Sequence, residues 1–315
     1  MPFSGEIHER VANAPVVPHG LPLVMLLTGF TDAGNAVSGL IDHLRETADP
    51  QPIAVFDNDL LLDYRARRPV VSFDQDHLTD FRPPRLELSL ATDALGQQFL
   101  LLAGYEPDFA WNAFARTILD LAAEFEVSGV TWVHSIAMPV PHTRPIGTTV
   151  SGNRRELGVV HSVWRPRTQV PATAGHLLEY RFVERGERTV GFVLLVPHYL
   201  AETENPDAVI TAADKVMAAT GLVLMLDAVQ ERRTDYLAKV DDQVIGNDEL
   251  QQMLHNLERR YDAYMAGRDP EDGSYDEGGF NERDLPSADE LAAELERYLA
   301  SRRSGDDDKS GRSGS

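Results

Sequence analysis

Five short apolar runs lie in the first two thirds of the chain, and most of them end at a glycine, a proline or a polar turn. They cover residues 23–27, 52–57, 98–104, 130–137 and 189–196. Strands that are apolar along their whole length lie in sheets covered on both faces. The runs therefore predict the buried strands of one sheet.

Helical spacing of apolar residues follows three of these runs, over residues 37–44, 109–122 and 206–219. Asn205 is the expected N-cap of the third helix, and Pro206 fits its first position. Buried strands that alternate with helices indicate right-handed crossovers and parallel pairing. The fold class that we predict is α/β, with a mainly parallel sheet flanked by helices and a helical extension at the C-terminus.

Residues 59–90 follow a different pattern, in which short apolar runs alternate with Arg-Pro and Asp-rich breaks. This pattern predicts strands and loops, joined in hairpins, that cover an edge of the sheet.

The last third of the chain is helical in pattern, with one piece over 222–229 and another over 247–265. We predict five parts in the whole chain. They are an α/β core (1–221), a helical region packed on it (222–265), an acidic linker (266–286), a helix (287–303) and a disordered tail (304–315). A Ser-x-x-Glu capping box opens the predicted helix 287–303, whose apolar stripe must pack either on the chain's own core or on a partner.

Composition narrows the possible partners. The 315 residues are 43% hydrophobic, and 50 acidic against 29 basic side chains give a net charge of −21. Such a charge repels phosphate backbones, so we expect no nucleic-acid partner. The chain has no cysteine, and it shows neither a signal-peptide pattern nor an apolar run of ~18 residues. We expect a cytoplasmic protein without membrane contact.

Polar side chains follow four of the predicted strands, and parallel strands bring such exits to one edge of the sheet, where ligands collect. The candidate catalytic residues are Asp32, Glu106, His142 and His198. The candidate ligand-binding residues are Thr31, Asn35, Asp108, Thr143, Arg144, Tyr199 and Glu202. Carboxylates, imidazoles, an arginine and a helix N-terminus together can bind an anion and transfer a proton.

Each candidate also has a structural alternative. Asp32 or Thr31 can simply cap the next helix, and Glu106 and Asp108 can favour a helix N-terminus. Arg144 can pair with one of these acids, and His198 can be an ordinary loop histidine.

Sequence signatures of several enzyme classes are missing. Residues 29–34 have the glycine spacing of a phosphate loop without its Lys-Ser/Thr, and the chain contains no Gly-x-Gly-x-x-Gly, Gly-x-Ser-x-Gly or His-Glu-x-x-His. The sequence therefore predicts no particular cofactor and no metal site.

Five motifs in order resemble the PAC2 family in its actinobacterial form. They are Gly-Phe-Thr-Asp-Ala-Gly-Asn-Ala (29–36), Gly-Tyr-Glu-Pro-Asp (104–108), Pro-His-Thr-Arg-Pro (141–145), Leu-Leu-Glu-Tyr-Arg (177–181) and Val-Pro-His-Tyr-Leu-Ala (196–201). The resemblance implies a phosphorylase/hydrolase-like α/β fold and a homo-oligomer, a trimer being one candidate. It also implies kinship with proteasome assembly chaperones, whose archaeal relatives are expected to end in a hydrophobic-Tyr-any tripeptide. This chain ends Arg-Ser-Gly-Ser.

Two hypotheses follow. The first is a non-catalytic protein-interaction module that resembles proteasome assembly chaperones, with proteasome subunits or other proteins as partners. The second is an enzyme or receptor for a small anionic or nucleoside-like ligand at the C-terminal edge of the sheet. There Asp32 or Glu106 would act as base and His142 or His198 as acid, while Arg144 and the backbone at 32–35 would hold the anion.

Overall fold

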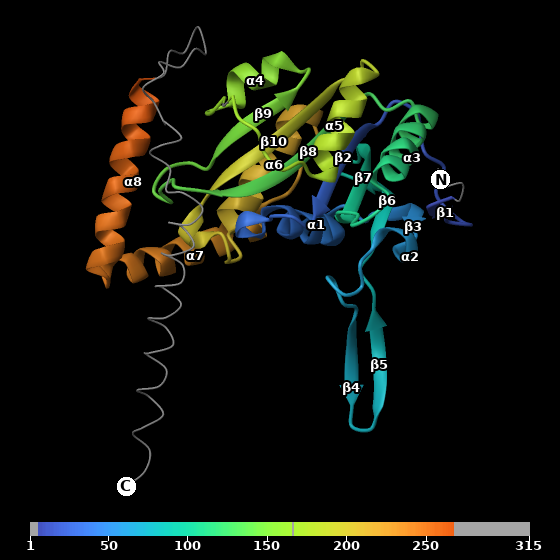
Figure 1. Cartoon of the computed structure of the whole chain (residues 1–315), viewed down its shortest axis with the longest axis horizontal. Helices are drawn as coiled ribbons and strands as arrows, with labels where there is room; N and C mark the ends of the chain where they lie inside the picture. Colours follow the sequence, from blue (N-terminus) through green and yellow to red (C-terminus); the bar gives the residue numbers. More distant parts are fainter. Residues whose placement is uncertain (1–5, 166, 268–315) are drawn as a thin grey trace. The chain divides into compact units, whose positions relative to one another are not determined.

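The computed structural model describes residues 6–165 and 167–267, and eight of its strands form one mixed sheet (Figure 1). The strand order is β1-β3-β6-β7-β2-β8-β10-β9. The strands are β1 (His8–Arg10), β2 (Pro22–Thr28), β3 (Gln51–Phe56), β6 (Leu86–Thr92), β7 (Gln98–Tyr105), β8 (Gly129–Met138), β9 (Gly147–Gly152) and β10 (Thr189–Pro197).

The middle of the sheet is parallel. Strands β7, β2, β8 and β10 pair in parallel, while β1, β3 and β6 on one side and β9 on the other pair antiparallel. All four parallel strands are predicted from their apolar runs, and each is buried along most of its length. The predicted α/β fold with a parallel core is therefore confirmed.

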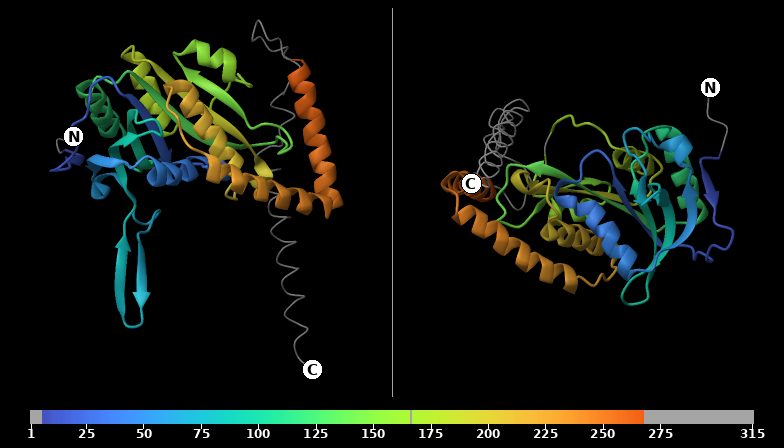
Figure 2. Two further views of the ribbon diagram at one scale, coloured as in Figure 1. Left: turned by 180° about the vertical axis from the view of Figure 1, so that it is seen from behind. Right: turned by 90° about the horizontal axis from the view of Figure 1, so that it is seen from below.

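Helices cover both faces of the sheet (Figure 2). Helices α1 (Ala36–Thr47) and α6 (Pro206–Thr220) share one apolar core with the sheet, and α3 (Trp111–Glu124) and α5 (Ala174–Glu184) share the core on the other face. As predicted, Asn205 caps α6, because its side chain accepts a hydrogen bond from the backbone N–H of Asp207, 3.0 Å away. The shorter elements are η1 (Ala33–Asn35), α2 (Asn58–Leu61), α4 (Arg155–His161) and η2 (His198–Leu200).

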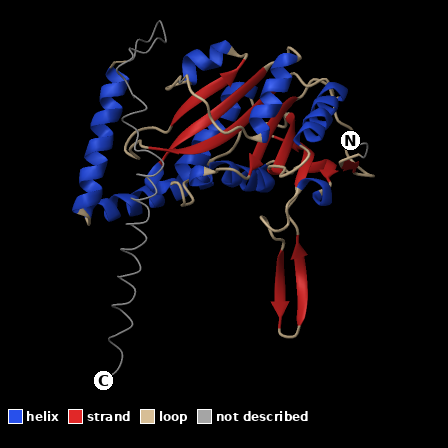
Figure 3. Cartoon of the chain, in the orientation of Figure 1, coloured by secondary structure: helices blue, strands red, loops and turns tan. Residues whose placement is uncertain are grey.

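Residues 59–90 differ from the prediction. Strand β6 pairs with β3 on one side and with β7 on the other, so it lies inside the sheet and not over its edge. Most of its residues are buried. Strands β4 (Val70–Asp74) and β5 (His77–Arg82) pair only with each other, and every residue in them is exposed. Figure 3 shows this hairpin extending away from the sheet instead of covering its edge.

The C-terminal part of the described chain is helical, as predicted, but its first boundary is shifted. Residues 222–226 form neither helix nor strand and bury Leu222, Leu224 and Leu226. The prediction of a helix over 222–229 is therefore wrong for the residues before α7 (Asp227–Ile245). Helix α8 (Asp248–Ala266) lies where the pattern predicts a helix. None of the helices in residues 6–165 and 167–267 is long and apolar enough to cross a membrane.

The chain divides into two compact units after Leu254. Our predicted boundaries at 221 and 265 remain predictions. The predicted helix 287–303, the tail 304–315 and nearly all of the predicted linker lie outside the described residues.

Candidate functional site

The four parallel strands end side by side, and the loops that follow them carry the candidate residues. Strands β2 and β7 are neighbours paired up to Thr28 and Tyr105, and the chain leaves them for opposite faces of the sheet, because α1 follows β2 and α3 follows β7. Such a switch between neighbouring strands opens a crevice at the sheet edge.

Asp32 acts as a cap in this structure. Its Oδ1 accepts hydrogen bonds from Val37 N–H (2.8 Å) and the Ser135 hydroxyl (3.2 Å), and its Oδ2 accepts from Ser38 N–H (2.9 Å) and the Ser38 hydroxyl (2.6 Å). A carboxylate offers about four lone-pair sites, and all are occupied. Asp32 thus fixes the start of α1, and no lone pair is left to take a proton from a substrate.

Thr31 connects this loop to a histidine that the sequence analysis did not select. The Thr31 hydroxyl donates to the Ser135 carbonyl (3.0 Å), so it must accept from Nε2–H of His134, also 3.0 Å away. This assigns the proton of the neutral ring to Nε2 and leaves Nδ1 as an acceptor. Burial, with a smaller effect of nearby His176, lowers the pKa of His134 to about 4. The ring is therefore neutral at pH 7.

Glu106 follows β7 and reaches the N-terminus of α5. Its Oε1 accepts the backbone N–H of Ala174, the first residue of that helix. Burial raises the pKa of Glu106, whereas the Ala174 N–H and Arg67 act to lower it. A Cβ at Gly29 would lie 2.8 Å from Cβ of Glu106. Only glycine therefore fits at the end of β2 beside this carboxylate.

Asp108 forms an ion pair with Arg67, which is not one of the candidate residues selected from the sequence. Arg67 also donates to the Glu106 carbonyl at 2.6 Å. Asp108 accepts a second bond from Asp63 N–H at 2.7 Å. The predicted ligand-binding carboxylate is thus engaged with the segment that leads into the β4–β5 hairpin.

His142 and Tyr199 lie together in a cluster with α7. Backbone N–H of His142 donates to the Tyr199 hydroxyl (2.8 Å), His142 Nδ1 lies 2.6 Å from the same oxygen, and Nε2 lies 3.1 Å from Asp241 Oδ1. The His142 side chain is only 4% exposed. These contacts connect the loop after β8 with α7, which is a structural role.

The other candidates lie around this edge. His198 packs against Tyr199 with ring centroids 5.4 Å apart, and Arg144 donates to the carbonyl and hydroxyl of Thr143. Asn35 has a left-handed backbone at the start of α1, and Glu202 is exposed. Among the described residues, no group of three His, Asp or Glu side chains could hold a metal ion.

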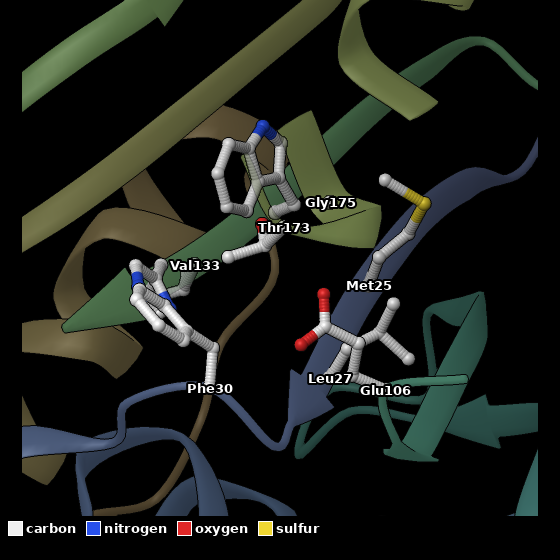
Figure 4. Close-up of a pocket in the computed structure, with 9 residues that line it drawn as sticks. Met25, Leu27, Phe30, Glu106, Val133, Thr173 and Gly175 are labelled. Carbon is white, nitrogen blue, oxygen red and sulfur yellow. The ribbon is translucent and has the colours of Figure 1, made fainter. Parts of the chain in front are cut away.

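A pocket opens between β2, β8 and the start of α5. Its lining consists of Met25, Leu27, Phe30, Glu106, Trp132, Val133, His134, Thr173 and Gly175. It encloses about 320 Å3 when its open mouth is included, but a water-sized molecule fits in only about 10 Å3 of it. Figure 4 shows the Glu106 carboxylate pointing toward the space that these side chains enclose. Of the eleven sequence candidates, only Glu106 lines this pocket.

Trp132 forms one wall, and two glycines make room for it. A Cβ at Gly175 would lie 2.7 Å from the indole ring, and one at Gly191 would lie 2.3 Å from Nε1. The indole N–H donates to Glu179 at 2.6 Å. Its polar atom is therefore satisfied by α5.

One residue of this pocket, His134, could have been recognised from the sequence. His134 and Ser135 are polar residues inside an apolar strand, and a buried polar group needs a partner. Thr173 and Gly175 had no such signal, because they reach the pocket only through the packing of α5.

Comparison with known proteins gives a family match. Residues 26–244 match the model of the PAC2 family. A crystal structure of a Mycobacterium tuberculosis protein of unknown function is 38% identical, with a TM-score of 0.78, over 84% of this chain and 94% of that one. A protein of unknown function from Corynebacterium glutamicum is 31% identical, with a TM-score of 0.79, over 82% of this chain and 97% of that one.

A third structure shares the fold at lower identity. It is a proteasome-assembly chaperone homologue from Mycobacterium tuberculosis, 21% identical with a TM-score of 0.68, over 74% of this chain and 100% of that one. No curated protein matches the sequence.

Proposed function

This chain belongs to the PAC2 family, and from that premise we propose that it is a non-catalytic protein-interaction module resembling proteasome assembly chaperones. The name of the mycobacterial homologue of the same fold supports this direction. The proposal places the protein in the cytoplasm, as a homo-oligomer that binds proteasome subunits or other proteins. The observation that carries it is the β4–β5 hairpin.

The hairpin has one apolar face. Phe73 and Leu78 are paired directly across the two strands, so they share a face, and Val71 follows on the same face by alternation. A bulge at Asp80 inserts one residue into β5, which brings Phe81 onto that face as well. The exposed fractions of Phe73, Leu78 and Phe81 are 72%, 65% and 66%.

An exposed apolar face such as that of the β4–β5 hairpin is stabilised when another protein surface packs on it. An isolated two-stranded hairpin is only marginally stable in water, and contiguous exposed apolar side chains mark protein-interaction sites. Among the described residues, neither β4 nor β5 pairs with a further strand, so both edges can also add a strand from a partner. The hairpin thus supports an interaction role that needs no catalytic group.

Native mass spectrometry of the full chain purified gently from its host tests this function. Phe73→Asp with Phe81→Asp places charge on the apolar face, and we expect it to remove the bound protein copies or partners. Ser72→Asp with Thr79→Asp places the same charge on the opposite face and is expected to leave them bound. Equal complexes for both variants would overturn the proposal.

A second candidate function is a receptor or enzyme for a small ligand at the sheet edge, and the pocket beside Glu106 favours it. Its chemistry differs from that of our sequence-based hypothesis, because the described lining holds one carboxylate and no arginine or lysine to attract an anion. A small mass retained by the native protein and lost in Glu106→Gln would support this candidate.

A further inference from the structure

We propose that the pocket beside Glu106 binds the ammonium group of a small molecule that carries a primary amine. This inference rests on the second candidate function, whose ligand class it names, and it does not depend on the hairpin. It rests on the size, the charge, the hydrogen-bond acceptors and the aromatic walls of the pocket.

The inner part of the pocket selects for size. A space of about 10 Å3 for a water-sized molecule is close to the minimum that one water requires. An ammonium group is as compact as water, whereas a carboxylate, a phosphate or a ring is too large to enter. The body of the ligand would remain in the wider mouth, where the side chain of Phe30 is 55% exposed.

The charge of the lining selects for a cation. Glu106 is the only Asp, Glu, Lys or Arg among the lining residues. Arg67, whose charge acts to lower the pKa of Glu106, forms its ion pair with Asp108, and Glu106 has no ion pair among the described residues. The charge of Glu106 is therefore available to a ligand, and a buried carboxylate gains most from a partner of opposite charge.

Two acceptors are available in this lining. Glu106 Oε1 is occupied by Ala174 N–H, but Oε2 has no hydrogen-bond partner among the described residues. His134 Nδ1 is an acceptor because Nε2–H donates to Thr31, and it too has no protein partner in the described chain. An ammonium group brings three donors and no acceptor, which matches a lining of this kind.

The walls favour a cation as well. Trp132 donates its indole N–H to Glu179, so its ring remains as an apolar wall of the pocket, and Phe30 contributes a second ring. Aromatic faces attract ammonium ions, and tryptophan does so most strongly. A carboxylate with aromatic walls therefore holds an amine better than a neutral alcohol of the same shape.

Titration of the 15N-labelled full chain with three isosteric probes tests the inference. The probes are benzylamine, benzyl alcohol and benzoate, and the reporter is the amide of Ala174, which is bonded to Glu106. We expect a saturable shift with benzylamine, binding weaker by at least roughly tenfold for benzyl alcohol, and no binding of benzoate. Equal binding of the amine and the alcohol would overturn the proposal, because the pocket would not select for charge. No saturable shift with any probe would also overturn it and leave a site for water only.

Two matched variants sharpen the test. Glu106→Gln keeps a carbonyl for Ala174 N–H but removes the charge, and we expect it to weaken benzylamine by roughly tenfold or more. Glu87→Gln removes a carboxylate on β6 outside the pocket and should leave the affinity unchanged. An unchanged affinity in Glu106→Gln would contradict the inference. The complexes tested through the hairpin would be unaffected, so the two proposals fail separately.

Discussion

The pocket beside Glu106 and the β4–β5 hairpin depart from the usual distribution of side chains in opposite ways. The pocket places a carboxylate, Glu106, and a histidine, His134, in a largely buried space, whereas the hairpin exposes phenylalanines to water. Buried polar groups need partners, and exposed apolar faces need cover. Each region is therefore incomplete by itself, and each indicates a different kind of binding partner.

The two regions also differ in how they are held. The pocket is built from the centre of the sheet and the start of α5, with glycines fitted around Trp132. Every residue of β4 and β5 is exposed, and within the described part of the chain the two strands pair only with each other. Substitutions should therefore separate them, with large effects on folding stability at the pocket and large effects on association at the hairpin.

The largest effect on stability is expected for Gly191→Ala. The new Cβ would lie 2.3 Å from Trp132 Nε1 and 2.4 Å from Glu179 Oε2, inside a central strand. We expect the free energy of unfolding to fall by about 3 kcal/mol, measured by urea denaturation. Gly158→Ala in α4 meets nothing within 4 Å and should be neutral or stabilising by up to about 1 kcal/mol. Equal effects of the two changes would refute a tightly packed pocket wall.

The second expected effect is a pH dependence of the free energy of unfolding, caused by buried His134. Unfolded His134 has the ordinary pKa of 6.5, whereas folded His134 has a pKa of about 4 because of burial. Between these values the unfolded chain binds more protons, so stability falls as pH drops, by up to about 1.4 kcal/mol per pH unit. Above pH 6.5 the group contributes no pH dependence.

His134→Gln isolates this contribution. Burial lowers the pKa of His176 in the same direction, but His176 is present in both proteins. We expect a flatter dependence of unfolding free energy on pH in the variant between about pH 6.5 and 4. Parallel curves for the two proteins would contradict a buried neutral His134.

A smaller effect is expected for Asp32→Ala, which removes the cap of α1. The loss should be about 1–2 kcal/mol. Benzylamine binding should stay within roughly twofold of the wild-type value, because the hydrogen bonds of Asp32 go to α1 and Ser135. Asp42→Ala, an exposed residue paired with Arg45, should change stability by less than about 0.5 kcal/mol. Loss of benzylamine binding in Asp32→Ala would show that Asp32 contributes to the ligand site as well as to the start of α1.

The smallest effect on stability is expected at the hairpin. Phe73→Asp with Phe81→Asp should change the unfolding free energy of the dilute, unassociated chain by less than about 0.5 kcal/mol, because neither ring packs on the core. A thermal or urea denaturation series at low protein concentration measures this. A loss of several kcal/mol would show that these rings stabilise the fold itself, and the contrast between the two regions would disappear.

The sequence predicted the parallel core well, for a physical reason. Strands β2, β7, β8 and β10 are buried on both faces, so their apolar runs are continuous and easy to recognise. Strand β6 was assigned to an edge cover because its neighbours β3 and β7 are known only from the pairing. Local pattern identifies a strand but not the strands beside it.

The candidate site was predicted only in part. Glu106 was found because it directly follows a strand that ends at the sheet edge. His134 was missed because it lies inside the apolar run, and Thr173 was missed because tertiary packing alone brings α5 to β2 and β8. His142 was grouped with Glu106 by topology, yet its hydrogen bonds connect it to Tyr199 and Asp241.

Hydrogen–deuterium exchange of the β4–β5 amides tests the central claim, that the hairpin is the contact surface, most directly. We compare the dilute chain with the complex that the native protein retains, and use the amides of β8 as the internal reference. The account predicts that exchange in β4 and β5 slows at least about tenfold in the complex, while β8 is unchanged. Unchanged hairpin exchange in a fully formed complex would contradict it.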